Sequence, residues 1–168
     1  MYTTYIARQA IFDRNRVTIG YELLFRDSPD NKFPEIDPDV ASSKLIIQSH
    51  LQGDIRSISM GKLAFINFTE KCLVNKYPLM FDNGAIIIEL VGHKSPTERL
   101  LKIVKFYHSK GYKIALTEYD LDDKWDVLFP FISIIKVDIE VINPKRLHKV
   151  IERLKDHNIK LAAEKVET

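Results

Sequence analysis

Apolar runs of strand length alternate with helical segments along most of the chain, and this order constrains the fold more than any single motif. The runs carry Ile, Leu, Val and Ala with few polar interruptions, and they are the expected strands 63–67, 85–90, 112–116, 132–139 and 159–164. Strands that alternate with helices form parallel sheets, and strands without polar alternation are covered on both faces. We therefore expect an α/β protein built on a parallel sheet.

The segments between these strands carry helix signals. Short helices are expected at residues 69–77 and 124–129. A helix over residues 95–108 is expected to begin in a capping box, SPTE, with Ser95 as the cap and proline at the first helical position. Asn143, which is followed by a proline, predicts the start of another helix whose apolar residues share one face.

The first part of the chain has a different pattern. Residues 5–12 and 17–25 are strand-like runs on either side of a short polar turn, so an opening β-hairpin is expected. Residues 27–39 are rich in proline and acidic residues, which indicates a loop. The apolar spacing of residues 40–52 predicts a helix that ends at Gly53.

A (β/α) barrel accounts for these elements better than an open nucleotide-binding sheet does. The chain has only 6 glycines and neither kind of glycine-rich phosphate loop, which argues against a Rossmann-type fold. With the opening hairpin there are about seven expected strands, whereas such barrels close with eight strands and usually need about 200 residues or more. We therefore expect a barrel that stops before it closes, with an unpaired edge at which a second copy of the chain can pair.

The composition excludes several classes of partner. The chain has 25 Lys and Arg against 23 Asp and Glu, a formal net charge of +2, so no large positive field is expected to recruit nucleic acid or an anionic membrane. Its single cysteine, Cys72, cannot form an intrachain disulfide. The N-terminus has no signal-peptide pattern, and no run approaches the roughly 18 to 20 apolar residues of a membrane span. A cytoplasmic protein is expected.

Polar residues stand at the ends of the strand-like runs or interrupt them. In a barrel the carboxyl ends of the strands meet at one mouth, so residues that are far apart in the sequence converge there. The set consists of Glu22, Asn67, Glu89, Thr117, Glu118, Lys136 and Glu164. Carboxylate and amide oxygens suit hard divalent cations such as Mg²⁺ or Mn²⁺. Carboxylates gathered in one mouth need a cation, a proton or a lysine such as Lys136, so either a metal site or a plain Lys-Glu network is expected.

Five short segments, in order and over nearly the whole chain, resemble the motifs of EAL domains, which are cyclic di-GMP phosphodiesterases. Glu22-Leu23-Leu24-Phe25-Arg26 resembles the family's Glu-Ala-Leu-Leu-Arg signature. FINFT resembles the family's strand that ends in asparagine, IIIEL its Leu-Glu-Ile-Thr-Glu, IIKVD its Leu-Lys-Ile-Asp and AEKVET its Ala-Glu-Gly-Val-Glu-Thr. The resemblance implies a modified TIM-type (β/α) barrel with an antiparallel first strand.

The opening sequence RQAIFDRNRVTIGYELLFRD is more similar still to the EAL half of bacterial EAL-HDOD proteins, in which a degenerate EAL domain precedes a helical HDOD domain. The resemblance implies a single EAL-like domain over residues 1–168 that lacks its C-terminal strands, with no HDOD domain in this chain. In the family, the segment that would follow bears a catalytic glutamine in a Gln-Gly motif. A truncated barrel is therefore the expectation.

The resemblance also implies roles for individual residues. The family's ligands to a first metal ion match Glu22, Asn67 and Glu89. Glu164 matches a ligand to a second metal ion, and Lys136 matches the lysine that helps orient the attacking water. Leu24 and Arg26 match positions that contact the ligand, with Arg26 facing a phosphate.

The chain departs from the family after the strand at 112–116. There the family has Asp-Asp-Phe-Gly, whose first aspartate bridges both metal ions, whereas this chain has Thr117 and then Glu118. A neutral hydroxyl does not bridge two cations, so a two-metal site of the usual kind is not expected, although Glu118 keeps a charge that is able to hold one ion. Gly92 replaces a glutamate that secures the loop over the active site, and Lys165 replaces a glycine.

Three functions remain open at this point. The first is a non-hydrolytic signalling domain of bacterial cyclic di-GMP pathways, which binds this ligand weakly or not at all and acts through contacts with partner proteins. The second is an active, metal-dependent cyclic di-GMP phosphodiesterase that uses Mg²⁺ or Mn²⁺. The third is a structural barrel without metal, whose strand-end acids are salt-bridged. The sequence favours the first because Leu24 and Arg26 are retained while position 117 is neutral.

Overall fold

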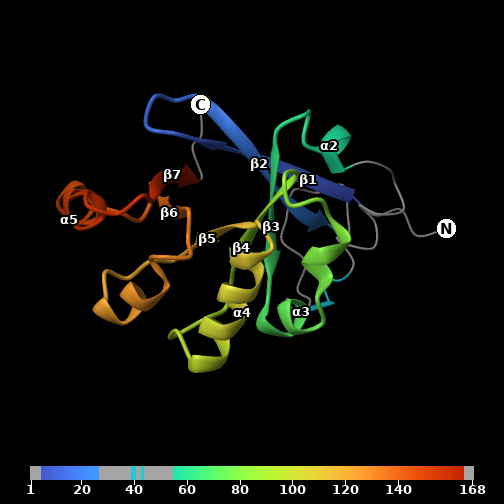
Figure 1. Ribbon diagram of the computed structural model, residues 1–168. Helices are drawn as coiled ribbons and strands as arrows, with labels where there is room; N and C mark the ends of the chain where they lie inside the picture. The colour runs from blue at the N-terminus through green and yellow to red at the C-terminus, as the bar shows by residue number, and fades with distance from the viewer. Residues whose placement is uncertain (1–4, 27–38, 41–42, 44–54, 165–168) are drawn as a thin grey trace.

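A computed structural model describes residues 5–26, 39–40, 43 and 55–164. In this part of the chain seven strands form a closed barrel in sequence order (Figure 1). The strands are β1 Tyr5–Phe12, β2 Thr18–Arg26, β3 Leu63–Phe68, β4 Ile86–Leu90, β5 Lys113–Leu116, β6 Ile134–Asp138 and β7 Lys160–Glu164. β1 pairs antiparallel with β2, and the successive pairs from β2 to β7 are parallel. The α/β class and the antiparallel first strand are thus confirmed.

Helices surround the barrel (Figure 1). They are α2 Ile55–Ile58, α3 Glu70–Val74, α4 Glu98–Ser109 and α5 Pro144–Leu154, with the 3₁₀ helices η1 Tyr77–Met80 and η2 Asp123–Leu128. The segment expected as a short helix at 124–129 is therefore a 3₁₀ helix. The loop expected at 27–39 and the helix expected at 40–52 fall almost entirely outside the described residues. None of the helices in the described ranges has the length and apolar character needed to cross a bilayer.

The cap of α4 differs from the expected one. Thr97, and not Ser95, precedes the first helical residue, and its hydroxyl accepts a hydrogen bond from the backbone N–H of Leu100 at 3.1 Å. Serine and threonine are both favourable N-caps, so the local sequence allows either residue. The cap of α5 is as expected, because Asn143 accepts a hydrogen bond from the backbone N–H of Arg146 at 2.8 Å.

The barrel is closed, and the expected open edge is wrong. β1 pairs antiparallel with β7 through Phe12 and Ala163. The opening hairpin turns β1 back alongside β2, so both edges of β1 are used, one by β2 and one by β7. The register of the hairpin shifts between Ile11 and Phe12, a bulge that bends the strand close to this closing contact. Closure removes the edge that was expected to pair with a second copy of the chain.

Alternate side chains of the strands fill the interior of the barrel. Successive residues of a strand point to opposite faces, so every second one points inward. One buried apolar layer is formed by Ile11, Phe65, Ile87, Ala115, Ile134 and Ala162. A larger apolar cluster packs the outer face of the sheet against the helices. The next inward-facing position lies two residues further along each strand or its extension. In β3, β4 and β6, and directly after β5, that position holds a polar residue.

Candidate functional site

The polar residues at the strand ends converge at the mouth of the barrel. Asn67, Glu89, Thr117 and Lys136 each stand two residues after a member of the buried apolar layer, on the same face of the strand or its extension. They line a pocket of about 520 Å³ together with Gln9, Glu22, Leu24, Val91, Glu118, Tyr119, Asp120, Val137, Asp138, Val141, Ile142 and Arg146. The structure thus brings together side chains from five different strands, β1, β2, β3, β4 and β6, and from the loops after β4, β5 and β6.

Lys136 lies between two carboxylates on the floor of this pocket. It is 1% exposed, and Glu22 and Glu89 are 7% and 0% exposed. Its Nζ atom lies 2.7 Å from Glu89 Oε1 and donates a hydrogen bond to Glu22 Oε2 at 3.1 Å. Buried charges are costly unless they are paired and hydrogen-bonded, and these two contacts provide the pairing. The arrangement is the Lys-Glu network that the sequence left open as the alternative to a metal site.

Asn67 completes the floor. Its Nδ2 donates a hydrogen bond to Glu22 Oε1 at 3.1 Å, so Asn67 holds one oxygen of that carboxylate and Lys136 holds the other. The Oδ1 of Asn67 is buried and has no hydrogen-bond partner among the described residues. A buried carbonyl oxygen without a partner is unfavourable, so this atom is a position at which a ligand N–H group, a water or a cation can be accepted.

Thr117 and Glu118 follow β5 and differ in their surroundings. The Thr117 hydroxyl donates a hydrogen bond to the backbone oxygen of Leu90 at 3.0 Å, at the end of the neighbouring strand β4. Glu118 is exposed, and its backbone has a φ of 55°. Position 117 therefore brings no charge to the floor of the pocket, and the carboxylate of Glu118 belongs to its rim.

The loop after β5 is held in place by α5 and η2. Leu121, like Glu118, has a positive φ, in its case 67°, which costs a residue with a side chain about 1 kcal/mol or more. Arg153 of α5 donates a hydrogen bond to the backbone oxygen of Leu121 at 3.2 Å and also binds the carboxylates of Asp123 and Asp126. These contacts stabilise a strained loop that forms one wall of the pocket.

Two pKa shifts mark the same loop. Burial is the largest effect on Asp120 and acts to raise its pKa, but hydrogen bonds from the backbone N–H of Asp122 and from Lys124 and Trp125 outweigh it and hold the pKa below its usual value. Burial raises the pKa of Tyr119, whose hydroxyl has no hydrogen-bond partner among the described residues. At neutral pH Asp120 is therefore ionised and Tyr119 is neutral.

The remaining residues singled out from the sequence lie near the same mouth. Leu24 lines the pocket and is 9% exposed. Arg26 is the last residue of β2, and Glu164 is the last residue of β7, where it pairs with Asp138 of β6. The backbones of Leu24, Arg26 and Glu164 therefore lie toward the carboxyl ends of their strands, as expected for residues near the mouth.

Several lining residues escaped the sequence analysis, among them Gln9, Val141 and Arg146. Gln9 pairs with Glu22 across the antiparallel hairpin, so the register of that hairpin is the signal that could have identified it. Val141 is 76% exposed at the mouth, and Arg146 donates a hydrogen bond to the backbone oxygen of Asp120 at 3.4 Å. Both follow β6 in the loop and first turn of α5, where no periodic pattern indicates which side chains face the pocket.

The residues of the floor fit an ammonium better than a pair of divalent ions. In the described ranges no three or more His, Cys, Asp and Glu side chains converge to hold a metal ion. Glu22 and Glu89 offer two buried carboxylates, but the Nζ atom of Lys136 already lies between them. Thr117 supplies a neutral oxygen that is directed to Leu90.

Comparisons with known proteins agree with the barrel. No protein-family model matches the chain. It is 38% identical over 140 residues, 83% of its length, to the cyclic di-GMP phosphodiesterase CdgJ of Vibrio cholerae, and it spans 32% of that protein. The structure of an EAL domain protein from Listeria monocytogenes matches with a TM-score of 0.70 at 15% identity, over 99% of this chain and 79% of that chain. The Bacillus subtilis YkuI protein, which has an EAL domain and was solved with cyclic di-GMP and calcium, matches with a TM-score of 0.68 at 17% identity, over 98% of this chain and 49% of that chain.

Proposed function

This chain is a domain of the EAL type, and from that premise we propose that it binds cyclic di-GMP at the mouth of the barrel without hydrolysing it. Its role in this proposal is that of a signalling domain in bacterial cyclic di-GMP pathways, which acts through the bound ligand and through contacts with partner proteins. Because the chain spans about a third of its Vibrio relative, the proposal concerns this barrel and not the activity of a longer protein.

The observation that carries the proposal is the neutral position 117 beside a floor whose two carboxylates already pair with a lysine. Two-metal hydrolysis of a phosphodiester needs carboxylates that hold both ions on either side of the reacting group. Here the carboxylates of Glu22 and Glu89 engage Lys136, and the Thr117 hydroxyl engages the backbone of Leu90. Binding of a ligand does not require the two metal ions that hydrolysis needs. The pocket of about 520 Å³ falls in the usual size range of ligand sites.

Acidic residues outnumber basic ones in the lining of the pocket, so we expect an anionic dinucleotide to bind weakly. Its described lining includes the five acidic residues Glu22, Glu89, Glu118, Asp120 and Asp138. Lys136 and Arg146 are the basic residues in the same lining. Arg146 is exposed at the rim, so it is the lining cation best placed to approach a phosphate. The motif resemblance assigns a phosphate contact to Arg26 as well.

Hydrolysis is the second candidate. Glu22, Asn67, Glu89 and Lys136 lie together on the floor, which is the set that a one-metal site would use. The Vibrio relative is named as a phosphodiesterase, and this also supports the second candidate.

A calorimetric titration of cyclic di-GMP separates the two candidates. The chain is titrated in Mg²⁺, in Mn²⁺ and in EDTA, and each sample is then chromatographed for linear product. The proposal expects binding in all three buffers and product in none. It also expects weaker binding for Arg146→Met and unchanged binding for Lys149→Met, since Lys149 is an exposed residue of the same helix outside the pocket. Linear product in either metal buffer would establish the second candidate instead, and an absence of binding in all three would leave only the contacts with proteins.

A further inference from the structure

The centre of the pocket floor is occupied by a side-chain cation. Lys136 Nζ forms an ion pair with Glu89 Oε1 at 2.7 Å and donates a charge-assisted hydrogen bond to Glu22 Oε2 at 3.1 Å. All three side chains come from the interior face of the barrel and are almost fully buried. Water therefore does little to screen the charges of this group from a further ion.

A divalent ion would compete with this ammonium for the same oxygens. Mg²⁺ and Ca²⁺ bind carboxylate oxygens at about 2.0–2.6 Å, so an ion shared by Glu22 and Glu89 would lie at or beside the position of Lys136 Nζ. If both cations stayed, three positive charges would lie beside the two carboxylates of Glu22 and Glu89. Thr117 adds no compensating charge, and Glu118 is exposed at the rim. Glu22, Glu89 and Lys136 together carry one net negative charge, which offsets only half of the charge of a dication.

We propose that Lys136 is the resident cation of the pair formed by Glu22 and Glu89, and that this pair takes up a divalent metal only when Lys136 is removed or a carboxylate is added at position 117. The inference rests on the proposed function, because it concerns the same pocket and explains how its two buried carboxylates are paired without a metal ion. It goes further because it attributes the exclusion of a metal ion to the Lys136 side chain and to the neutral residue at position 117.

The test at position 117 uses Mn²⁺ itself as the probe. The wild-type chain, Thr117→Asp and Thr117→Asn are titrated with MnCl₂ and followed by calorimetry and by water-proton relaxation. The wild-type chain and Thr117→Asn are expected to show no saturable site below about 1 mM, the weak range of protein–ligand affinities. Thr117→Asp is expected to bind at least about tenfold more tightly, because its added carboxylate balances the dication.

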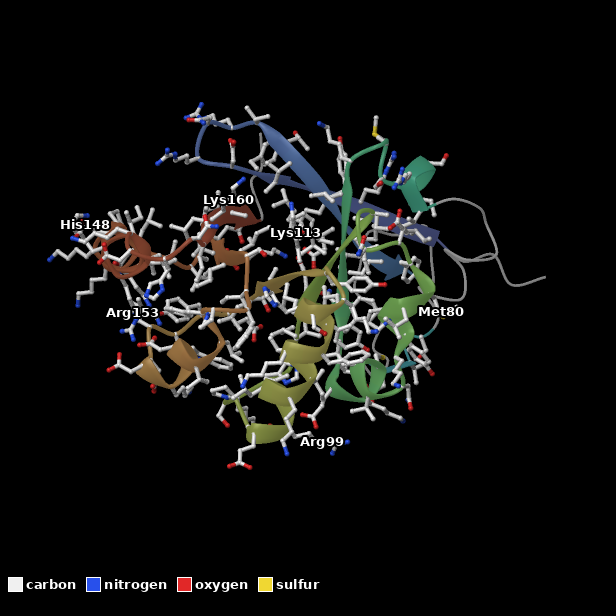
Figure 2. All side chains as sticks on the ribbon, viewed as in Figure 1. Met80, Arg99, Lys113, His148, Arg153 and Lys160 are labelled. Carbon is white, nitrogen blue, oxygen red and sulfur yellow. The ribbon has the colours of Figure 1, made fainter. Side chains whose placement is uncertain are left out.

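The test at position 136 follows thermal unfolding in EDTA and in MnCl₂. Lys136→Met leaves two buried carboxylates without a cation, so its Tm in EDTA is expected to fall by roughly 6 °C or more. Mn²⁺ is expected to restore part of this loss, whereas the wild-type Tm is expected to be the same in both buffers. The control is Lys113→Met, which removes an exposed lysine of strand β5 (Figure 2) and is expected to leave the Tm unchanged in either buffer.

A saturable Mn²⁺ site of micromolar affinity in the wild-type chain, lost in Glu89→Gln, would overturn the inference. A Thr117→Asp variant that gains no Mn²⁺ affinity would overturn it as well, and this result does not depend on whether Lys136→Met folds. Neither outcome depends on cyclic di-GMP. Ligand binding without product in the presence of Mn²⁺ would leave the proposed function standing even if Lys136 failed to exclude the metal.

Discussion

Two tyrosine hydroxyls are buried between the helices and the outer face of the sheet, where each must find an acceptor. Tyr107 of α4 donates a hydrogen bond to the backbone oxygen of Leu73, and Tyr112 donates one to the backbone oxygen of Phe81 at 2.6 Å. Both rings are buried, and they meet edge to face with their centroids 5.9 Å apart. In each case a polar atom is removed from water and satisfied by the end of a helix or turn.

Because Tyr107 is buried, we expect the stability of the chain to fall at alkaline pH. Burial, followed by the neighbouring Tyr112, raises the pKa of Tyr107 from 10.0 to about 12, so the folded state favours the neutral phenol. The stabilisation is complete below pH 10, where the phenol is neutral in both states, and it is lost as the pH rises from 10 to 12. We expect a loss of about 2 to 3 kcal/mol over this range from Tyr107 alone, measured by urea unfolding at each pH.

The control for this prediction is Tyr107→Phe. It removes the hydrogen bond to Leu73 and lowers the stability at neutral pH. Its stability should then fall less steeply than that of the wild-type chain above pH 10. Parallel curves for the two proteins would show that the alkaline loss has another origin.

At the scale of single residues, the sequence located the site better than it described the contacts. The ends of the apolar runs placed Asn67, Glu89 and Lys136 together, because the carboxyl ends of barrel strands meet at one mouth. Whether Lys136 or a metal ion pairs with the carboxylates could not be read from those positions. The answer depends on the distances between β2, β4 and β6, which local sequence does not encode.

At the scale of single elements, the start of α4 is a testable feature. The Thr97 hydroxyl satisfies the backbone N–H of Leu100, whereas Ser95 lies outside the helix. We expect Thr97→Ala to lower the free energy of unfolding by about 1 kcal/mol and Ser95→Ala to leave it unchanged, as measured by chemical denaturation. A larger loss of stability in Ser95→Ala than in Thr97→Ala would instead support the capping box with Ser95 as the cap.

Gly20 of β2 is a second element-level feature, because it allows β2 to approach β3 closely. A Cβ atom at this position would lie 2.5 Å from the backbone oxygen of Leu63 and 2.6 Å from the ring of Phe65. Phe65 belongs to the buried layer of the barrel and cannot move without disturbing it. We therefore expect Gly20→Ala to destabilise the chain by about 2 kcal/mol, measured by thermal or urea unfolding.

Gly84 provides the matched control for this substitution. It lies in a turn where the nearest atom to an added Cβ is Asp82 Oδ1 at 3.9 Å. Gly84→Ala should therefore change the stability little. Equal effects of the two substitutions would mean that the approach of β2 to β3 is not the reason for the glycine at position 20.

At the scale of the whole molecule, an ion-pair cluster joins α5 to η2 and to the loop that walls the pocket. Arg153, labelled in Figure 2, is the centre of this cluster. It has 26% of its side chain exposed, and it binds Asp126 at 2.9 Å together with Asp123. We expect Arg153→Met to lower the free energy of unfolding by about 2 kcal/mol, because several charge-assisted hydrogen bonds are lost together.

Arg99, labelled in the same figure, is the control for Arg153. It pairs with Glu70 at 3.1 Å, but 66% of its side chain is exposed. Arg99→Met should change the stability by less than about 0.5 kcal/mol, since exposed pairs are screened by water. If the two substitutions have equal effects in urea unfolding, the cluster does not fasten α5 to the barrel.

The sequence by itself determined the strands and their order. Apolar runs indicated β3 to β7, the hairpin indicated β1 and β2, and the alternation with helices indicated a barrel, because these signals depend only on neighbours along the chain. The tertiary structure decided what depends on distant segments. It closed the barrel through Phe12 and Ala163, where a count of strands predicted an open edge. It also placed the Lys136 ammonium between Glu22 and Glu89, since only the packing of β2, β4 and β6 around one core brings those three charges within reach of each other.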